Sequence, residues 1–346
     1  MPHKVGDTKK SRDRLPTCPT RVKMDRETLW LWLCSADGVG PTTANALWSR
    51  LCERGLALED FYALGETDWA GEFGLNARMV KGLTEQKLRM SAIVDLAESL
   101  READVHLISL EAPQYPASVK ASLNRSAPPL LYAVGNVSLL EQKAVAVVGA
   151  RDASPRGLTI ARGIGEAVTR HGLVLVSGGA KGVDDAAHRG ALAGGGATIV
   201  VLSCGILRSR PTAEFGEQAD PRSTLYLSEL DPNMTWQVGG AMARNRIVCG
   251  LTSAVVVVEA KESGGTMDAA RKAMELRKPL FVVQFDRYDA HSAGNASLLR
   301  KGGRPLPAQY DSTTDSWRVD IEPILTLVEG AAPPQAPSGQ SDLFSP

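Results

Sequence analysis

Three glycine-rich segments between residues 148 and 268 carry residue types that are suited to binding an anion. They run from Val148 to Gly157, from Val176 to His188 and from Val258 to Asp268. Glycine lets backbone N–H groups approach an anion closely, and the helix expected after each segment directs its positive end toward the bound group. The candidate anion-binding residues in these segments are Arg151, Ser177, Gly178, Gly179, Lys181, Gly182, Ser263, Gly264, Gly265 and Thr266.

A cationic cluster, Arg244-Asn245-Arg246, lies in an otherwise apolar stretch from Ala243 to Leu251. Guanidinium groups bind phosphate oxygens through paired N–H donors, and Asn245 can hydrogen-bond a base or the loop backbone. We therefore predict that Arg244 and Arg246 bind phosphate together with the glycine-rich segments. The alternative is a pair of solvated surface arginines.

Asp184 and His188 are four residues apart, which places them one turn apart on the helix expected after the second glycine-rich segment. They could act as an acid–base pair, but Asp184 also suits the start of a helix and His188 a packed position beside it. No serine lies in a recognisable nucleophile elbow, and the phosphate-binding pattern GxxxxGK[ST] is absent. We therefore expect this pair to organise the loop, and we assign no catalytic residue, metal or cofactor.

Short runs rich in β-branched residues are expected to position these segments. They are Ala144–Val148, Leu173–Val176, Thr198–Leu202, Leu225–Leu227, Ala254–Glu259 and Leu280–Val283. Continuous apolar strands that alternate with helices are typical of a mostly parallel sheet with helices on both faces. The fold class expected is therefore a doubly wound α/β domain, in which ligands bind beyond the carboxyl ends of the strands.

The rest of the sequence predicts a leader, a helical domain and a tail. Residues 1–23 are charged and without periodicity, so we expect a disordered leader. Apolar residues recur at helical spacing over residues 24–101, which indicates a small all-helical domain of SAM-like type. The α/β domain then spans residues 102–329 and begins with a proline-rich, extended connector up to residue 140. Residues 330–346 are expected to form a flexible tail.

The helical domain contains a segment similar to a helix-hairpin-helix element, from Ala36 to Leu47. Gly38 and Gly40 allow a tight turn there, and Pro41 suits the first turn of the second helix. Backbone N–H groups at the start of that helix can bind a phosphate in some hairpins of this kind. In others the hairpin only packs, and the sequence leaves both interpretations open.

The composition limits the kind of nucleic-acid site that is expected. The 346 residues suggest about two domains, and 39 Lys and Arg balance 39 Asp and Glu, so such a site must be a local patch. Five cysteines without a CxxC pair argue against a disulfide framework and a zinc knuckle. No signal sequence and no apolar run of the roughly 20 residues that cross a bilayer is present. We therefore expect a cytoplasmic protein without a membrane partner.

Together these segments resemble the DNA-processing protein A family (DprA, also called Smf). The matching stretches are Tyr115-Pro116, Pro129–Gly135, Val147–Arg151, Ser177–Asp184 with His188, Leu227–Glu229, Arg244–Val248, Val258–Ala260 with Ser263-Gly264, and Gly294-Asn295. The resemblance implies a Rossmann-like fold, a homodimer and a non-catalytic protein that protects single-stranded DNA and helps load the RecA recombinase. Its implied setting is natural transformation (competence) and DNA recombination. The resemblance assigns the phosphates to Arg151, Lys181, Arg244 and Arg246.

The chain departs from the family pattern in three places, so we expect a divergent member. The aromatic residue usual three positions before Arg244 is Ala241 here, and Arg210-Pro211 stands where the family has Tyr-Pro-x-x-Asn. No C-terminal winged helix is expected after Glu329. A second class of function stays open, namely a Rossmann-like nucleotide-ligand sensor or nucleotide hydrolase, with phage defence as a setting.

The segment from Gln340 to Phe344 is similar to the short peptide that binds the bacterial sliding clamp. Leu343 and Phe344 would fill an apolar pocket of the clamp, and Gln340 would hydrogen-bond its rim. The alternative is a tail that folds back onto the globular domain.

Overall fold

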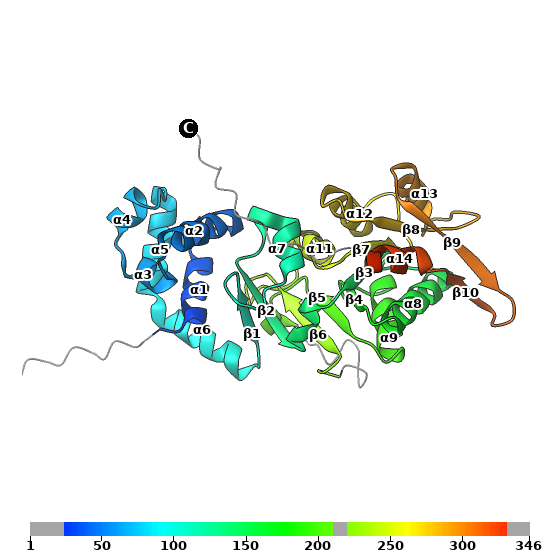
Figure 1. Cartoon of the computed structure of the whole chain (residues 1–346), viewed down its shortest axis with the longest axis horizontal. Helices are drawn as coiled ribbons and strands as arrows, with labels where there is room; N and C mark the ends of the chain where they lie inside the picture. Colours follow the sequence, from blue (N-terminus) through cyan, green and yellow to red (C-terminus); the bar gives the residue numbers. More distant parts are fainter. Residues whose placement is uncertain (1–23, 210–219, 331–346) are drawn as a thin grey trace, which may run out of the picture.

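A helical domain leads into a ten-stranded sheet in the computed structural model, which describes residues 24–209 and 220–330 (Figure 1). The strand order is β1-β2-β6-β5-β4-β3-β7-β8-β9-β10. The bounds are His106–Ser109 (β1), Leu130–Gly135 (β2), Ala144–Val148 (β3), Val174–Ser177 (β4), Thr198–Val201 (β5), Thr224–Ser228 (β6), Ala254–Val257 (β7), Leu280–Gln284 (β8), Arg304–Asp311 (β9) and Ser316–Val319 (β10). Neighbours from β6 through β9 in this order pair in parallel, and the outer pairs are antiparallel.

The predicted doubly wound, mostly parallel α/β fold is confirmed. Along β3, Val145 and Val147 pack into the core on one face of the sheet, and Ala144 and Ala146 pack into the core on the other. Helices α8 (Pro155–Arg170), α9 (Val183–Ala193) and α14 (Glu322–Gly330) contribute to the first face. Helices α7 (Ala117–Leu123), α11 (Val238–Leu251), α12 (Gly265–Glu275) and α13 (Ala293–Arg300) contribute to the second. Because both faces are covered, the central strands are continuous apolar runs.

The connector of residues 102–140 differs from the extended segment that we expected. It forms β1 and β2, with α7 and the 3-10 helices η1 (Asn124–Ser126) and η2 (Val137–Glu141) beside them. β2 pairs with β6, so this segment widens the sheet instead of crossing over it. The prolines masked the strand pattern in the sequence. Pro128 and Pro129 lie just before β2, where the ladder requires no N–H donor.

Residues 24–105 fold as six helices around a tryptophan core. The helices are α1 (Arg26–Ser35), α2 (Pro41–Arg54), α3 (Leu58–Ala63), α4 (Glu66–Gly71), α5 (Ala77–Leu88) and α6 (Met90–Glu102). Trp32 is fully buried and its ring lies against those of Phe61 and Trp69. Gly38, with φ +82°, makes the turn between α1 and α2. The Asn45 side chain of α2 donates to the Ala127 carbonyl at 2.8 Å, which ties this domain to the connector.

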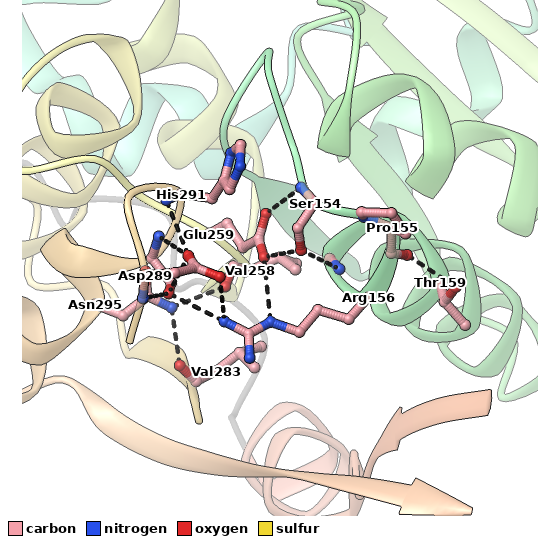
Figure 2. A network of polar contacts seen from close by, with 12 residues as sticks. Ser154, Pro155, Arg156, Thr159, Val258, Glu259, Val283, Asp289, His291 and Asn295 are labelled. Atoms are coloured by element: carbon pink, nitrogen blue, oxygen red, sulfur yellow. Dashed lines mark hydrogen bonds and ion pairs between the residues drawn. The ribbon is translucent and has the colours of Figure 1, made fainter. Parts of the chain in front are cut away.

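A buried carboxylate, Glu259, closes the N-terminus of α8 (Figure 2). It lies two residues after the end of β7 and accepts hydrogen bonds from the Ser154 N–H at 2.8 Å and from the Ser154 hydroxyl. Ser154 in turn accepts from the Gly157 N–H and so caps α8. A helix N-terminus at this edge of the sheet is a common anion site. At the start of α8 the Glu259 carboxylate takes the place that an anionic ligand would occupy.

Asn295 joins the ends of the neighbouring strands β7 and β8 in the same network (Figure 2). Its side-chain amide donates to the carbonyls of Val258 and Val283, both at 2.8 Å, and its carbonyl oxygen accepts from the Ala260 N–H. Arg156 of α8 lies near Glu259 and pairs with Asp289 at 2.8 Å. The loops after β3, β7 and β8 are therefore held in fixed relation to one another.

His188 of α9 is a second interior polar group. Its Nδ1 lies 2.6 Å from the Thr198 hydroxyl of β5, and the ring is fully buried. Burial, with a smaller contribution from the charge of Arg244, lowers the pKa of His188 to about 3. The imidazole is therefore neutral at physiological pH and fixes α9 to the sheet.

We predict that Glu259→Ala lowers the free energy of unfolding by about 3 kcal/mol, because it leaves the Ser154 donors and Arg156 without their buried partner. Urea denaturation measures this change. Glu262→Ala, an exposed position in the same loop, is the matched control and should shift stability by less than about 0.5 kcal/mol. Equal stability of the two variants would show that the carboxylate does not hold α8.

We predict that His188 makes stability fall as the pH drops below about 6.5. Below that pH, His188 binds a proton in the unfolded chain, whereas in the folded protein it stays neutral until the pH falls to about 3. The contribution approaches about 1.4 kcal/mol per pH unit. His188→Gln should therefore flatten the dependence of unfolding free energy on pH between 7 and 4.5, whereas His171→Gln, at an exposed position, should not. Identical pH profiles for wild type and His188→Gln would refute the assignment.

Candidate functional site

A hollow of about 360 Å³ opens beyond the carboxyl ends of β3 and β7. These strands are neighbours in the sheet. From β3 the chain continues to β4, which lies on the other side of β3 from β7, so the order of the strands reverses between β3 and β7. Loops diverge at such a reversal and leave a crevice, which is where open α/β sheets bind ligands. The predicted site residues that line the hollow are Arg151, Asp184, Arg244, Asn245, Ser263, Gly264, Gly265 and Thr266.

Arg244 of α11 is the cation at the base of this hollow. Its side chain is 6% exposed, and its Nε has no hydrogen-bond partner within residues 24–209 and 220–330. Its guanidinium lies directly over Gly178, where an added Cβ would come 1.2 Å from Nη1. Burial lowers the pKa of Arg244, and the Asp184 carboxylate opposes this shift. A buried cation with an unused donor favours an anionic ligand.

The second glycine-rich segment contributes Asp184 to the lining of the hollow, and its other predicted residues support the loops around it. Ser177 is fully buried and donates to the Val147 carbonyl, which joins β4 to β3. Asp184, in the first turn of α9, is buried and accepts from the Ala180 N–H. Burial raises the pKa of Asp184, and the charge of Arg244 works against this. Gly182, with φ +85°, would place a Cβ 2.4 Å from the Ala150 carbonyl oxygen, so the loops after β3 and β4 touch.

The third segment presents the N-terminus of α12 to the hollow. Gly264 is the N-cap residue, has φ +108° and supplies no side-chain cap. The first N–H groups of α12 are therefore available to an anion. Asn245 holds this helix start in place, because its amide donates to the Gly265 carbonyl at 3.2 Å and to Asp268 at 3.0 Å. Asn245 is thus engaged with the loop backbone, one of the two roles that the sequence left open.

The structure does not bring Arg246 to the hollow. One nitrogen of its guanidinium donates to Glu229 and another to the Ser126 carbonyl. Burial raises the pKa of Glu229, and the charge of Arg246 opposes this. Residues two apart on a helix point in different directions, so Arg244 and Arg246 cannot both face the same ligand. Their proximity in the sequence and the family resemblance had both suggested that the two arginines bind phosphate together.

Other predicted residues lie beside the hollow or outside the described part of the chain. Lys181 is exposed on the loop before α9, and Gly179 lies next to Gly178 in the same loop. Neither is part of the lining. The proposed clamp-binding residues Gln340, Leu343 and Phe344, the leader of residues 1–23 and Arg210-Pro211 lie outside the described residues.

Two lining residues carry no clear signal in the sequence. Trp236, just before α11, lies beside Arg151, whose guanidinium carbon is 5.7 Å from the ring centroid. Lys261 forms an ion pair with Asp152 at 3.3 Å across the mouth of the hollow. Trp236 belongs to no periodic pattern, and its only signal is an aromatic residue eight positions before Arg244. The family pattern has its aromatic residue at position 241, where Ala241 contributes only a methyl group to the lining.

The hollow can therefore bind a phosphate-like group and a planar group side by side. Arg151, Arg244 and the start of α12 supply positive charge and N–H donors, and Trp236 supplies a flat surface. In the part of the chain that the structure describes, no cluster of His, Cys, Asp and Glu could hold a metal ion. Within the same residues no helix has the length and apolar character to cross a membrane.

Comparison with known proteins identifies relatives of this chain. It is 29% identical to the DNA processing protein DprA of Bacillus subtilis over 214 residues, which are 61% of this chain and 71% of the relative. It is 36% identical to DprA of Streptococcus pneumoniae over 186 residues, 54% of this chain and 66% of the relative. Protein Smf of Synechocystis is 30% identical over 293 residues, 81% of this chain and 70% of the relative.

Solved structures give the same picture. The crystal structure of DprA from Streptococcus pneumoniae superimposes with a TM-score of 0.68 at 28% identity and covers 82% of this chain and 95% of its own. A structure from a study of single-stranded DNA binding by Helicobacter pylori DprA has a TM-score of 0.52 at 29% identity, covering 65% and 94%. The sequence profile of the family described as DNA recombination-mediator protein A matches residues 106–316, and the chain therefore belongs to this family.

Proposed function

We propose that this protein binds single-stranded DNA in the hollow beyond β3 and β7 without altering it chemically. The observation that carries the proposal is the set of donors around the hollow, namely the buried guanidinium of Arg244, the exposed Arg151 and the uncapped start of α12. A phosphate placed there would satisfy these donors. The Helicobacter pylori relative, whose structure was studied for its single-stranded DNA binding mode, supports DNA as the polymer.

We further propose that the bound strand is passed to a recombinase of the RecA type. The family's description as a recombination mediator supports this step. A mediator must hold the strand by its backbone and leave much of it accessible to the next protein. A local hollow in a chain with balanced charge meets that requirement better than a uniformly basic surface.

We predict that Arg244→Ala and Arg151→Ala each weaken the binding of labelled oligo-dT and reduce its dependence on salt. For each phosphate that the variant no longer neutralises, the slope of log affinity against log salt should fall by about 0.7. Fluorescence anisotropy at four salt concentrations measures both quantities. Arg222→Ala is the matched control, since this exposed arginine lies before β6, at the opposite edge of the sheet.

The exposed Arg151 keeps this test valid if Arg244→Ala fails to fold. Unchanged affinity and slope in Arg151→Ala and a folded Arg244→Ala would remove the hollow as the binding site. A panel of mononucleotides, titrated in parallel, separates a second outcome. Tight binding of one mononucleotide with no gain from a longer strand would indicate a nucleotide sensor and contradict the proposal.

We predict a different signature for Arg246, which positions α11 instead of contacting phosphate. Arg246→Ala should weaken oligo-dT binding and lower thermal stability, yet leave the salt slope unchanged, because the number of neutralised phosphates stays the same. Glu229→Gln should do the same, since it breaks the same ion pair. A direct phosphate contact predicts the reverse for Glu229→Gln, namely tighter binding after a negative charge is removed. A reduced slope in Arg246→Ala would also reject the positioning role.

A further inference from the structure

The exposed apolar side chains of this protein are unevenly distributed. The large ones in the described residues are Leu88, Leu158, Trp236, Val238, Met242, Tyr288 and Tyr310. Three of them, Trp236, Val238 and Met242, fall within seven consecutive residues at the start of α11, and all three line the hollow. Exposed apolar residues scattered singly need no explanation, whereas a group of them rimmed by charge marks a contact site.

Trp236 is the centre of this group. About half of its side chain is exposed (51%), although the indole is among the most costly side chains to leave in water. The Arg151 guanidinium lies over the ring and orients it through a cation–π contact. The arginine leaves the remaining surface of the indole free to receive a second planar group.

The surroundings of Trp236 determine what kind of planar group fits. Arg151, Arg244 and Lys261 line the same hollow, and of the acidic residues there Asp152 pairs with Lys261 and Asp184 is buried beside Arg244. A ligand must therefore combine a flat aromatic part with an adjacent anion. A nucleotide unit of a nucleic acid has this composition.

We propose that Trp236, flanked by Val238 and Met242, stacks on a nucleobase of the strand whose phosphate binds Arg151 and Arg244. The inference rests on the function proposed above and adds the base-binding half of the site. Stacking is tolerant of sequence because every base has a π face, and the Met242 thioether adapts to the base edge. In a duplex the faces of the bases are covered by their neighbours, so this contact selects single strands.

The test compares two ligands of equal charge, oligo-dT and an oligomer of the same length with abasic sites. Wild type should bind oligo-dT more tightly. Trp236→Ala should weaken oligo-dT binding about tenfold, which corresponds to the loss of one stacked base. It should leave the affinity for the abasic oligomer and the salt slope unchanged, since Trp236 neutralises no phosphate. Trp236→Phe should retain most of the affinity for oligo-dT.

Tyr310→Ala provides the matched control, because Tyr310 is an aromatic residue of similar exposure (52%) on β9 and does not line the hollow. The inference is overturned if Trp236→Ala weakens both oligomers equally, or neither, or if Tyr310→Ala has the same effect. The failure of the proposed function looks different. In that case wild type binds neither oligomer in a salt-dependent way.

Discussion

The buried guanidinium of Arg244 constrains much of the structure around it. A cation inside a protein requires an opposite charge or hydrogen-bond acceptors close by, and the Asp184 carboxylate supplies that charge here. Gly178 must lack a side chain because the guanidinium occupies that space. Asp184 faces the cation from α9, and Asn245, the next residue of α11, fixes the start of α12. Arg244 also lines the hollow, and its positive charge there favours an anionic ligand.

Two helix N-termini at this edge of the sheet differ in whether a side chain of the protein occupies them. Glu259 occupies the start of α8 with its own carboxylate, while the start of α12 carries no side-chain cap and opens on the hollow. The Glu259 carboxylate also joins the loops after β3 and β7, whereas the start of α12 is held by Asn245. Of these two helix starts, only that of α12 is open to a phosphate.

The helical domain is connected to the site through a short piece of the connector. Asn45 of α2 holds the Ala127 carbonyl, and Arg246 of α11 holds the neighbouring Ser126 carbonyl. Ser122 also donates to the Gly250 carbonyl of α11 at 3.3 Å. The position of α11, and with it that of Arg244, thus depends on contacts with the connector and, through the connector, on the helical domain.

The sequence by itself determined the class of the fold and indicated a candidate anion-binding site. Continuous apolar strands such as Ala144–Val148 require cover on both faces, and glycines combined with Arg151 and Arg244 indicate an anion site, because both are local properties of residue types. The antiparallel strands β1 and β2 were not predictable, since the prolines that precede β2 suggested an extended connector and the pairing of β2 with β6 joins segments about 90 residues apart.

Only the tertiary structure decided which of the candidate residues lie together. Arg244 and Arg246 are equivalent in the sequence, but one faces the hollow and the other pairs with Glu229, because a helix turns them in different directions and the partner is distant in the chain. The position of Trp236 in the lining of the hollow likewise depends on a contact with a residue distant in the chain. Its contact with Arg151 links residues 85 positions apart. Local pattern specifies what a residue can do, and long-range packing determines where it can do it.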